Sequence, residues 1–389
     1  MFCSSPGQTY FISLFGGEIR SALDLSHGQF GSIYSAATLL SAFLLLRTGS
    51  LIDRFPLHKV AICVSVSLAL GGVLLSQSYN VFMLFIAVLL LRHFGQGLTS
   101  MTASTTMMRH LSEHKAKANA LSTMGYSASE AIMPSIIFLL ITLVSWRTSW
   151  LFIGVGLVII VPCLSLLLLS SSRYKSAASI QTSNPDDATP VFGDQRQWTR
   201  SEVIRDPFFY LYIPGLMSNS MLYTGFMFHQ IHLVESKGWA LSSWAGLYVL
   251  FSITSMLTML SVGSLSDKIG AIRLAPWASL PVGIGLLILS SSDNLWVAAA
   301  FMVLMAISTG AQGALAAPFF AERYGNKNFA SIKSLGAFAM IIMTASSPIL
   351  LGWLIDRGFT INTLAASSAV YAFLATLISF SAYRVLIRQ

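Results

Sequence analysis

Long apolar runs alternate with short polar turns along almost the whole chain. A helix needs about 20 mainly apolar residues to cross a bilayer. The unbroken runs differ from the roughly 10-residue alternating strands of membrane barrels, so we predict helices. The twelve predicted spans cover approximately residues 3–18, 28–47, 58–78, 80–105, 118–143, 147–170, 207–230, 243–262, 272–291, 294–320, 332–354 and 362–385.

The first predicted span is short and contains several polar residues, among them Ser4, Ser5 and Gln8. It lacks the basic start and apolar middle of a cleaved signal peptide. We expect it to be the later part of a helix whose beginning is missing from this sequence.

Composition supports an all-α integral membrane protein. Of the 389 residues, 54% are hydrophobic and only 10% are charged, whereas a soluble domain has roughly 25% charged residues. The net charge is +8, but the basic residues are spread over many short loops, so we expect no nucleic-acid partner. The three cysteines lie beside or inside apolar runs and show no metal-ligand spacing.

The distribution of Lys and Arg predicts the orientation. If the turn at 47–59 is cytoplasmic, 18 of the 23 cations lie on that side and four on the other, with Arg92 inside a span. The positive-inside rule therefore predicts that both termini lie in the cytoplasm. We expect the protein to lie in the inner (plasma) membrane of the cell.

One polar segment, 171–206, divides the spans into two sets of six. Its first part is rich in Ser, Asn, Asp and Thr and cannot fold alone. Thr199 and Glu202 have capping-box spacing, so a short helix should follow on the cytoplasmic surface. We predict an N-terminal bundle over 1–170, a linker over 171–206 and a C-terminal bundle over 207–389.

Two copies of one polar turn indicate that the halves are related. Each copy has a Gly, an Asp four residues later, an adjacent cation and another cation five residues on. We call them the first clip (Gly49, Asp53, Arg54, Lys59) and the second clip (Gly263, Asp267, Lys268, Arg273). The same 214-residue offset relates Arg109 to Arg323 and Pro134 to Pro348, so we predict two pseudo-symmetric six-helix bundles.

These clips resemble the loop 2–3 pattern of the major facilitator superfamily of secondary transporters, Gly-x-x-x-Asp-Arg-x-Gly-Arg-Arg/Lys. Phe55, Pro56 and Leu57 depart from it, because the second Gly is absent. Arg92, Gly95 and Gly97 match the family's span 4 pattern. The resemblance covers essentially the whole chain. It implies alternating access by two halves and a small-molecule substrate, with no cofactor.

Two segments, 15–20 and 198–207, look like bacterial members near the monocarboxylate and oxalate–formate group. That similarity implies a small organic anion as substrate, and we expect proton-coupled symport by a monomer. Drug or toxin efflux is the alternative, although Met133 rather than Gly precedes Pro134 in span 5. A transporter-like receptor is a remote alternative. No cluster of the kind that an enzyme needs appears in the sequence, so we expect no enzyme activity and no metal site.

Arg92 is the first candidate for binding or coupling. It lies about 12 residues into span 4, near mid-bilayer, where a cation costs at least about 2.5–3.5 kcal/mol. Helical spacing places Gln96, Thr99 and Thr106 on its face. Arg92 either binds an anionic substrate through its planar fork or forms a structural ion pair. Glu130, at a similar depth in span 5, would pair with it or titrate as the proton carrier.

The second half offers polar residues without a cation to match Arg92. Asn219, Tyr223 and Gln230 are expected on one face of span 7, together with Phe226. His229 near the outer end could sense protons. Gln312 in span 10 lies four residues after Ser308.

The clips have a mechanical interpretation that follows from the family resemblance. Asp53 is expected to latch against the start of span 11, with Arg109 and Arg54 as cationic partners. Asp267 would do the same against span 5. Such latches would close the cytoplasmic side and break when the carrier opens inward.

Overall fold

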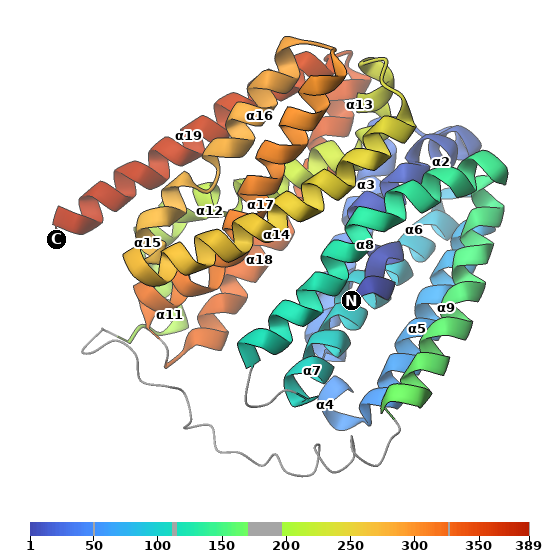
Figure 1. The fold of residues 1–389 in the computed structure, drawn as a ribbon, viewed down its shortest axis with the longest axis horizontal. Helices are drawn as coiled ribbons and strands as arrows, with labels where there is room; N and C mark the ends of the chain where they lie inside the picture. Colours follow the sequence, from blue (N-terminus) through green and yellow to red (C-terminus); the bar gives the residue numbers. More distant parts are fainter. Residues whose placement is uncertain (50, 111–114, 170–196, 326, 389) are drawn as a thin grey trace. The chain divides into compact units, whose positions relative to one another are not determined.

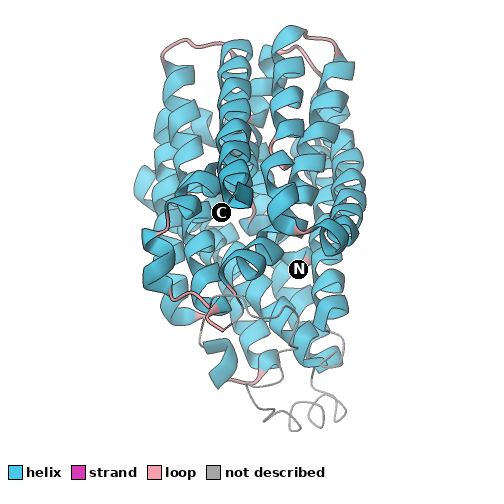
Figure 2. Cartoon of the chain, turned by 90° about the vertical axis from the view of Figure 1, so that its left-hand side faces the viewer, coloured by secondary structure: helices cyan, strands magenta, loops and turns pink. Residues whose placement is uncertain are grey.

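A computed structural model of the chain describes residues 1–49, 51–110, 115–169, 197–325 and 327–388. Every regular element in these ranges is a helix (Figure 2). Backbone N–H and C=O groups in hydrocarbon must be paired within the chain, and a helix does this within each segment. The predicted all-α architecture is confirmed.

The chain divides into two compact units, Met1–Val191 and Phe192–Gln389 (Figure 1). The described elements of the first unit are η1 (Phe2–Gly7), α1 (Thr9–Ile12), η2 (Ser13–Phe15), α2 (Gly16–Leu23), α3 (His27–Thr48), α4 (Leu51–Arg54), α5 (Leu57–Ser76), α6 (Val81–Leu90), η3 (Leu91–Thr99), α7 (Ser100–His110), α8 (Lys115–Leu143) and α9 (Trp146–Leu169).

The described part of the second unit starts with the short helix α11 and contains both long and short helices. Its described elements are α11 (Arg200–Arg205), α12 (Pro207–Phe228), α13 (Gln230–Ser236), α14 (Leu241–Ile269), α15 (Ala271–Leu274), η5 (Ala275–Trp277), α16 (Leu280–Ser291), α17 (Leu295–Tyr324), α18 (Phe329–Asp356) and α19 (Ile361–Arg388). Within this unit α14 packs along α17, and α12 packs along α18.

Ten helices in the described residues are long and apolar enough to cross a membrane. The two remaining predicted spans are the first and the seventh. The first is a series of short helical pieces, in which Gln8 adopts an extended backbone between η1 and α1. The seventh, α12, carries Ser218, Asn219 and Ser220 in its middle, and these polar residues lower its mean hydropathy.

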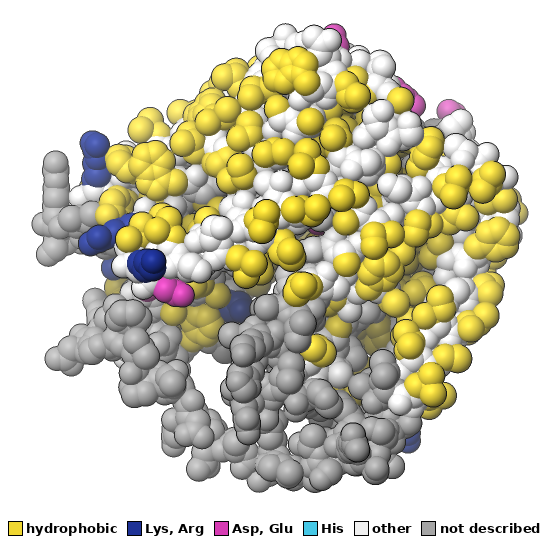
Figure 3. Space-filling model, in the orientation of Figure 1, with side chains coloured by type: hydrophobic (Ala, Val, Ile, Leu, Met, Phe, Trp, Pro, Cys, Tyr) yellow, Lys and Arg dark blue, Asp and Glu magenta, His cyan; other side chains and the backbone are white. Residues whose placement is uncertain are grey.

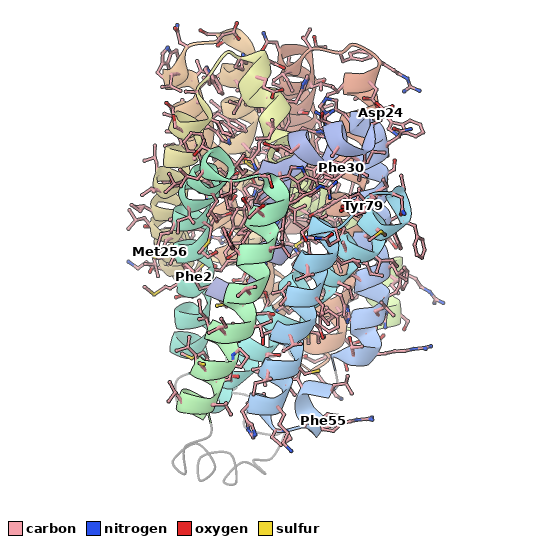
Figure 4. The ribbon with its side chains drawn as sticks, turned by 90° about the vertical axis from the view of Figure 1, so that its right-hand side faces the viewer. Phe2, Asp24, Phe30, Phe55, Tyr79 and Met256 are labelled. Carbon is pink, nitrogen blue, oxygen red and sulfur yellow. The ribbon has the colours of Figure 1, made fainter. Side chains whose placement is uncertain are left out.

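The outer surfaces of the helices are suited to lipid. On α14 the exposed residues Val249, Ile253, Leu257 and Leu260 follow helical spacing. Figure 3 shows hydrophobic side chains along the helix flanks, whereas the visible Lys and Arg of the second unit gather near α15. In the first unit, Figure 4 places Phe55 at one end and Asp24 at the other. The first clip therefore lies at the end opposite the turn between α2 and α3.

The second clip is fixed by a carboxylate that the sequence analysis did not single out. Glu322, near the end of α17, accepts hydrogen bonds from the backbone N–H of Ala271 (2.7 Å) and of Ile272 (3.0 Å). These N–H groups begin α15, where a helix has unpaired donors and a positive dipole end. Gly270 precedes them with φ +90°, which a residue with a Cβ rarely adopts.

The segment before α12 is fastened to the same end of α17. Thr199 and Glu202 form the expected capping box at the start of α11. The Trp198 N–H donates to the Tyr324 carbonyl (3.1 Å), and Arg323 pairs with Asp206 at 3.3 Å. Asp206 also caps α12 by accepting from the Phe208 N–H. The last turn of α17 thus holds the second clip and the entry to α12 together.

We expect Glu322→Ala to destabilise the protein by about 2 kcal/mol, because two helix-starting N–H groups lose a charged acceptor. Glu322→Gln, which keeps one acceptor oxygen, should lose less. Thermal unfolding of the purified protein in detergent measures this. The matched control is Asp267→Ala, whose side chain is exposed on α14. If Asp267→Ala lowers the unfolding temperature as much as Glu322→Ala, then Glu322 is not the anchor of the clip.

Candidate functional site

Arg92 lies inside the first unit with 3% of its surface exposed. Its Nε donates to Thr38 Oγ1 on α3 (3.0 Å), and its Nη1 donates to the Gly7 carbonyl (2.9 Å). The guanidinium carbon also lies 5.0 Å from the centre of the Tyr34 ring. Three segments far apart in the sequence therefore meet at this one side chain.

The local backbone explains how Arg92 reaches the carbonyl of Gly7. Residues 91–99 form a π-helix, η3, and such local widening is frequent at functional sites. Gly7 and Gly95 touch backbone to backbone: a Cβ on Gly7 would lie 2.3 Å from the Leu91 carbonyl, and one on Gly95 would lie 2.7 Å from the Gly7 Cα. Only glycine at both positions permits this approach.

All three contacts of Arg92 are electrically neutral. No carboxylate of the described residues lies within ion-pair distance of its guanidinium, and Glu130 is not among its contacts. The hydroxyl, the carbonyl and the ring face satisfy part of the hydrogen-bonding capacity of the guanidinium without cancelling its charge. The Arg92–Glu130 ion pair considered from the sequence is not formed in this structure.

Glu130 lies on α8 with 4% of its surface exposed. The Tyr126 hydroxyl approaches its Oε1 at 3.5 Å. The rings of Tyr10 and Tyr126 meet edge to face, with centroids 6.3 Å apart. Tyr10 in turn bonds Ser129 Oγ at 2.8 Å, and Ser129 bonds Ser5. A buried carboxyl thus adjoins a connected set of hydroxyl groups.

The polar stripe predicted along span 4 is divided. Arg92 points to α3 and Gly7, and Gln96 is exposed. Thr99 and Thr106 instead line a mainly apolar cavity of about 380 Å³ within the first unit, beside α5 and α9. The prediction assumed α-helical spacing, and the π-helix between Arg92 and Thr99 changes that spacing.

The second unit contains a neutral polar cluster between α12 and α17. Asn219 Nδ2 donates to Thr309 Oγ1 (3.1 Å) and to Gln312 Oε1 (3.2 Å). The Ser220 hydroxyl donates to the same Gln312 oxygen at 2.9 Å. Asn219 and Gln312 are buried, while Ser220 and Thr309 are partly exposed at its edge. The structure therefore brings together Asn219 and Gln312, two of the candidate site residues predicted from the sequence.

The other candidates of the second unit lie apart from this cluster. Helix α12 ends at Phe228, so Gln230 belongs to α13, where it accepts from Trp244 and Tyr248 at 2.8 Å each. His229 Nε2 lies 3.0 Å from the Pro348 carbonyl on α18. The Tyr223 ring packs against Phe251. Gln230 and His229 therefore hold helices together around the end of α12.

The clip residues lie at helix ends. Gly49 ends α3, and Arg54 and Lys59 are exposed around the start of α5. The side chains of Asp53 and Arg109 lie outside the described residues. In the second clip, Gly263, Asp267 and Lys268 belong to α14, and Arg273 belongs to α15. The latch partners expected for Asp53 and Asp267 stay a prediction.

Three residues that contribute to these sites were not identified from the sequence. Thr38 and Gly7 bind Arg92, and Glu322 holds the second clip. Glu322 had a signal, because it adjoins Arg323, which belongs to the repeat. Thr38 is an ordinary small polar residue of an apolar span, and only the packed structure distinguishes it.

Comparison with solved structures shows the fold. A bacterial homologue of the human lysosomal transporter Spinster, in an inward-facing and unoccupied conformation, aligns with a TM-score of 0.71 at 13% identity, covering 100% of this chain and 95% of the other. A mutant of the nucleoside transporter NupG gives a TM-score of 0.74 at 12% identity, covering 98% and 97%. No curated protein matches the sequence significantly.

The sequence also matches a family model. The model described as Major Facilitator Superfamily aligns with residues 1–334, which is well over half of the chain. The match agrees with the all-helical architecture and with both structural neighbours. It indicates a multi-pass membrane transporter rather than an enzyme, and it leaves the monocarboxylate and oxalate–formate branch without support. The chain belongs to the major facilitator superfamily of secondary transporters.

Proposed function

We propose that this transporter carries small organic anions and that Arg92 binds the carboxylate of the substrate. The observation that supports the proposal is a buried cation whose described partners are all neutral. A cation at membrane depth costs several kcal/mol unless it is paired or reaches water. A bound carboxylate would supply the missing charge.

The geometry of Arg92 is suited to this role. Its Nε and Nη1 are held by Thr38 and Gly7, which fixes the plane of the guanidinium. Its Nη2 makes no hydrogen bond with the described residues. A fork held in this way loses little further conformational entropy when it binds a carboxylate. We therefore assign to Thr38 and Gly7 the role of orienting Arg92.

Proton coupling through Glu130 is part of the proposal. Glu130 is a buried carboxyl beside the Tyr126 hydroxyl, and a carboxyl can take up and release a proton. The adjoining hydroxyls of Tyr10, Ser129 and Ser5 could accept and donate protons. We further propose that both termini and both clips face the cytoplasm, from the distribution of cations in the sequence.

Arg92→Met should weaken carboxylate binding roughly 10- to 100-fold, because charge-assisted hydrogen bonds to the substrate are lost. Arg92→Lys keeps the charge without the planar fork and should give an intermediate loss. Calorimetric titration of the purified protein with acetate, oxalate and pyruvate measures this. The control is Arg147→Met, a cation of the same unit bonded to the Ser76 and Ser78 carbonyls. Undiminished carboxylate affinity in folded Arg92→Met would exclude the proposal.

Glu130→Gln should abolish the acceleration of uptake by an inward proton gradient, because the glutamine amide cannot take up or release a proton at the pH of the assay. Exchange of labelled for unlabelled substrate across the membrane should continue, since it needs no net proton movement. Proteoliposomes with an imposed pH gradient allow both measurements. The control is Glu18→Gln, a partly exposed carboxylate on α2. Gradient-driven accumulation that persists in Glu130→Gln would show that Glu130 does not carry the proton.

A further inference from the structure

We infer that the second unit binds an anionic phospholipid, with the lipid phosphate between Arg273 and Arg384 and the acyl chains along α16 and α19. The inference goes beyond the proposed function, because the ligand is a component of the membrane rather than the transported solute. It rests on two exposed stripes of side chains that belong to this unit alone.

The first stripe runs along α15, η5 and α16. Arg273 on α15 is exposed, and Trp277 on η5 is 50% exposed. On α16 they are followed by Ile284 and Leu287, which are 39% and 51% exposed. These four residues succeed one another at close to helical spacing, so they share one face. A cation, an aromatic ring and aliphatic side chains therefore follow in this order from the end of the membrane span inward.

Helix α19 carries a second stripe with the same order. Arg384 is exposed near the end of the helix, and Phe380 lies one turn before it. Leu377 and Leu374 are 60% and 52% exposed on the preceding turns. The guanidinium carbon of Arg384 lies 4.8 Å from the centre of the Phe380 ring. This cation–π contact holds the charge of Arg384 above the aromatic ring.

A contact between two aromatic rings places the stripes side by side. Trp277 and Phe380 meet edge to face, with centroids 5.4 Å apart, and α16 packs along α19. Helix α16 runs away from Arg273, whereas α19 runs toward Arg384 (Figure 1). Each cation thus lies about one helical turn beyond its aromatic residue, toward the same end of the unit. Two cations therefore stand next to each other above two apolar stripes.

The two cations have no carboxylate partner. Neither Arg273 nor Arg384 forms an ion pair with the described residues. Glu322 accepts two backbone hydrogen bonds at the start of α15. Asp267 adjoins Lys268 in the last turn of α14, and their charges cancel. The patch therefore has a net positive charge, and Figure 3 shows Lys and Arg side chains gathered at this end of the second unit.

The order of the side chains identifies the class of ligand. A phosphate accepts charge-assisted hydrogen bonds from guanidinium groups, a Trp side chain favours the interfacial region of the bilayer, and aliphatic side chains match acyl chains. A free phosphate would use the cations alone. Under the proposed orientation this end lies at the cytoplasmic leaflet, where anionic lipids attract basic residues. An anionic phospholipid satisfies both the cations and the stripes.

Native mass spectrometry of the purified protein tests the inference with phosphatidylglycerol and phosphatidylcholine of identical acyl chains. The unmodified protein should bind phosphatidylglycerol roughly 10- to 30-fold more tightly, because both cations attract the net negative headgroup. In the double variant Arg273→Gln/Arg384→Gln the ratio of the two affinities should fall to about 1. The control is Arg357→Gln, which precedes α19 at its other end. Arg357 is also exposed and also lies over an aromatic ring, that of Trp353, at 5.8 Å.

Each outcome decides the question. Equal affinity of the unmodified protein for the two lipids overturns the inference, and so does a preference that survives in the double variant. A preference that Arg357→Gln removes as fully as the double variant does would show that the charge effect is not specific to this patch. Inorganic phosphate at the concentration of the lipid should leave phosphatidylglycerol bound. If inorganic phosphate displaces it, the patch is a site for free anions and the inference is wrong.

Discussion

An apolar interior forces each polar group to find a partner within the chain, and Arg92 is the group for which this is hardest. The structure meets the requirement only in part. It brings the broken first segment to η3 at the Gly7–Gly95 contact and turns a backbone carbonyl toward the guanidinium. The extended backbone at Gln8 follows from this arrangement, since a regular helix would use its carbonyls internally. The geometry of the first unit is thus arranged around one uncompensated charge.

The second clip is held by a carboxylate that the corresponding position of the first half of the sequence does not repeat. In the second clip, Glu322 binds the first N–H groups of α15 after Gly270. The residues 214 positions earlier are Met108 and Pro56. A methionine carries no charge, and α5 begins at Leu57 with Pro56 as an N-cap that makes no side-chain capping hydrogen bond. The second clip is therefore fastened within its own unit by Glu322, and the corresponding position 108 of the sequence holds an uncharged residue.

The features of the fold that depend on local sequence patterns were predicted correctly. Lipid-facing periodicity, the capping box at Thr199 and the repeat of Gly, Asp and cation are all local, and they led to the helical architecture and the family. What the sequence could not predict depends on packing. The π-helix moved Thr99 and Thr106 away from the face of Arg92. Likewise, the end of α12 at Phe228 removed Gln230 from the face of Asn219. The widening of a helix and the residue at which a helix ends are invisible in the sequence, and they decide which side chains meet.

The halves match at their ends and differ in their interiors. The offset that pairs Arg109 with Arg323 pairs Arg92 with Ala306 and Glu130 with Thr344. Duplication thus preserved the clips and the proline positions, whereas the buried chemistry diverged. The first unit holds a charge and a carboxyl, and the second holds a neutral amide cluster with one unpaired oxygen. A buried charge needs a counter-charge or water, whereas a neutral amide cluster can be satisfied by hydrogen bonds within its own unit, so the two interiors obey different energetic constraints.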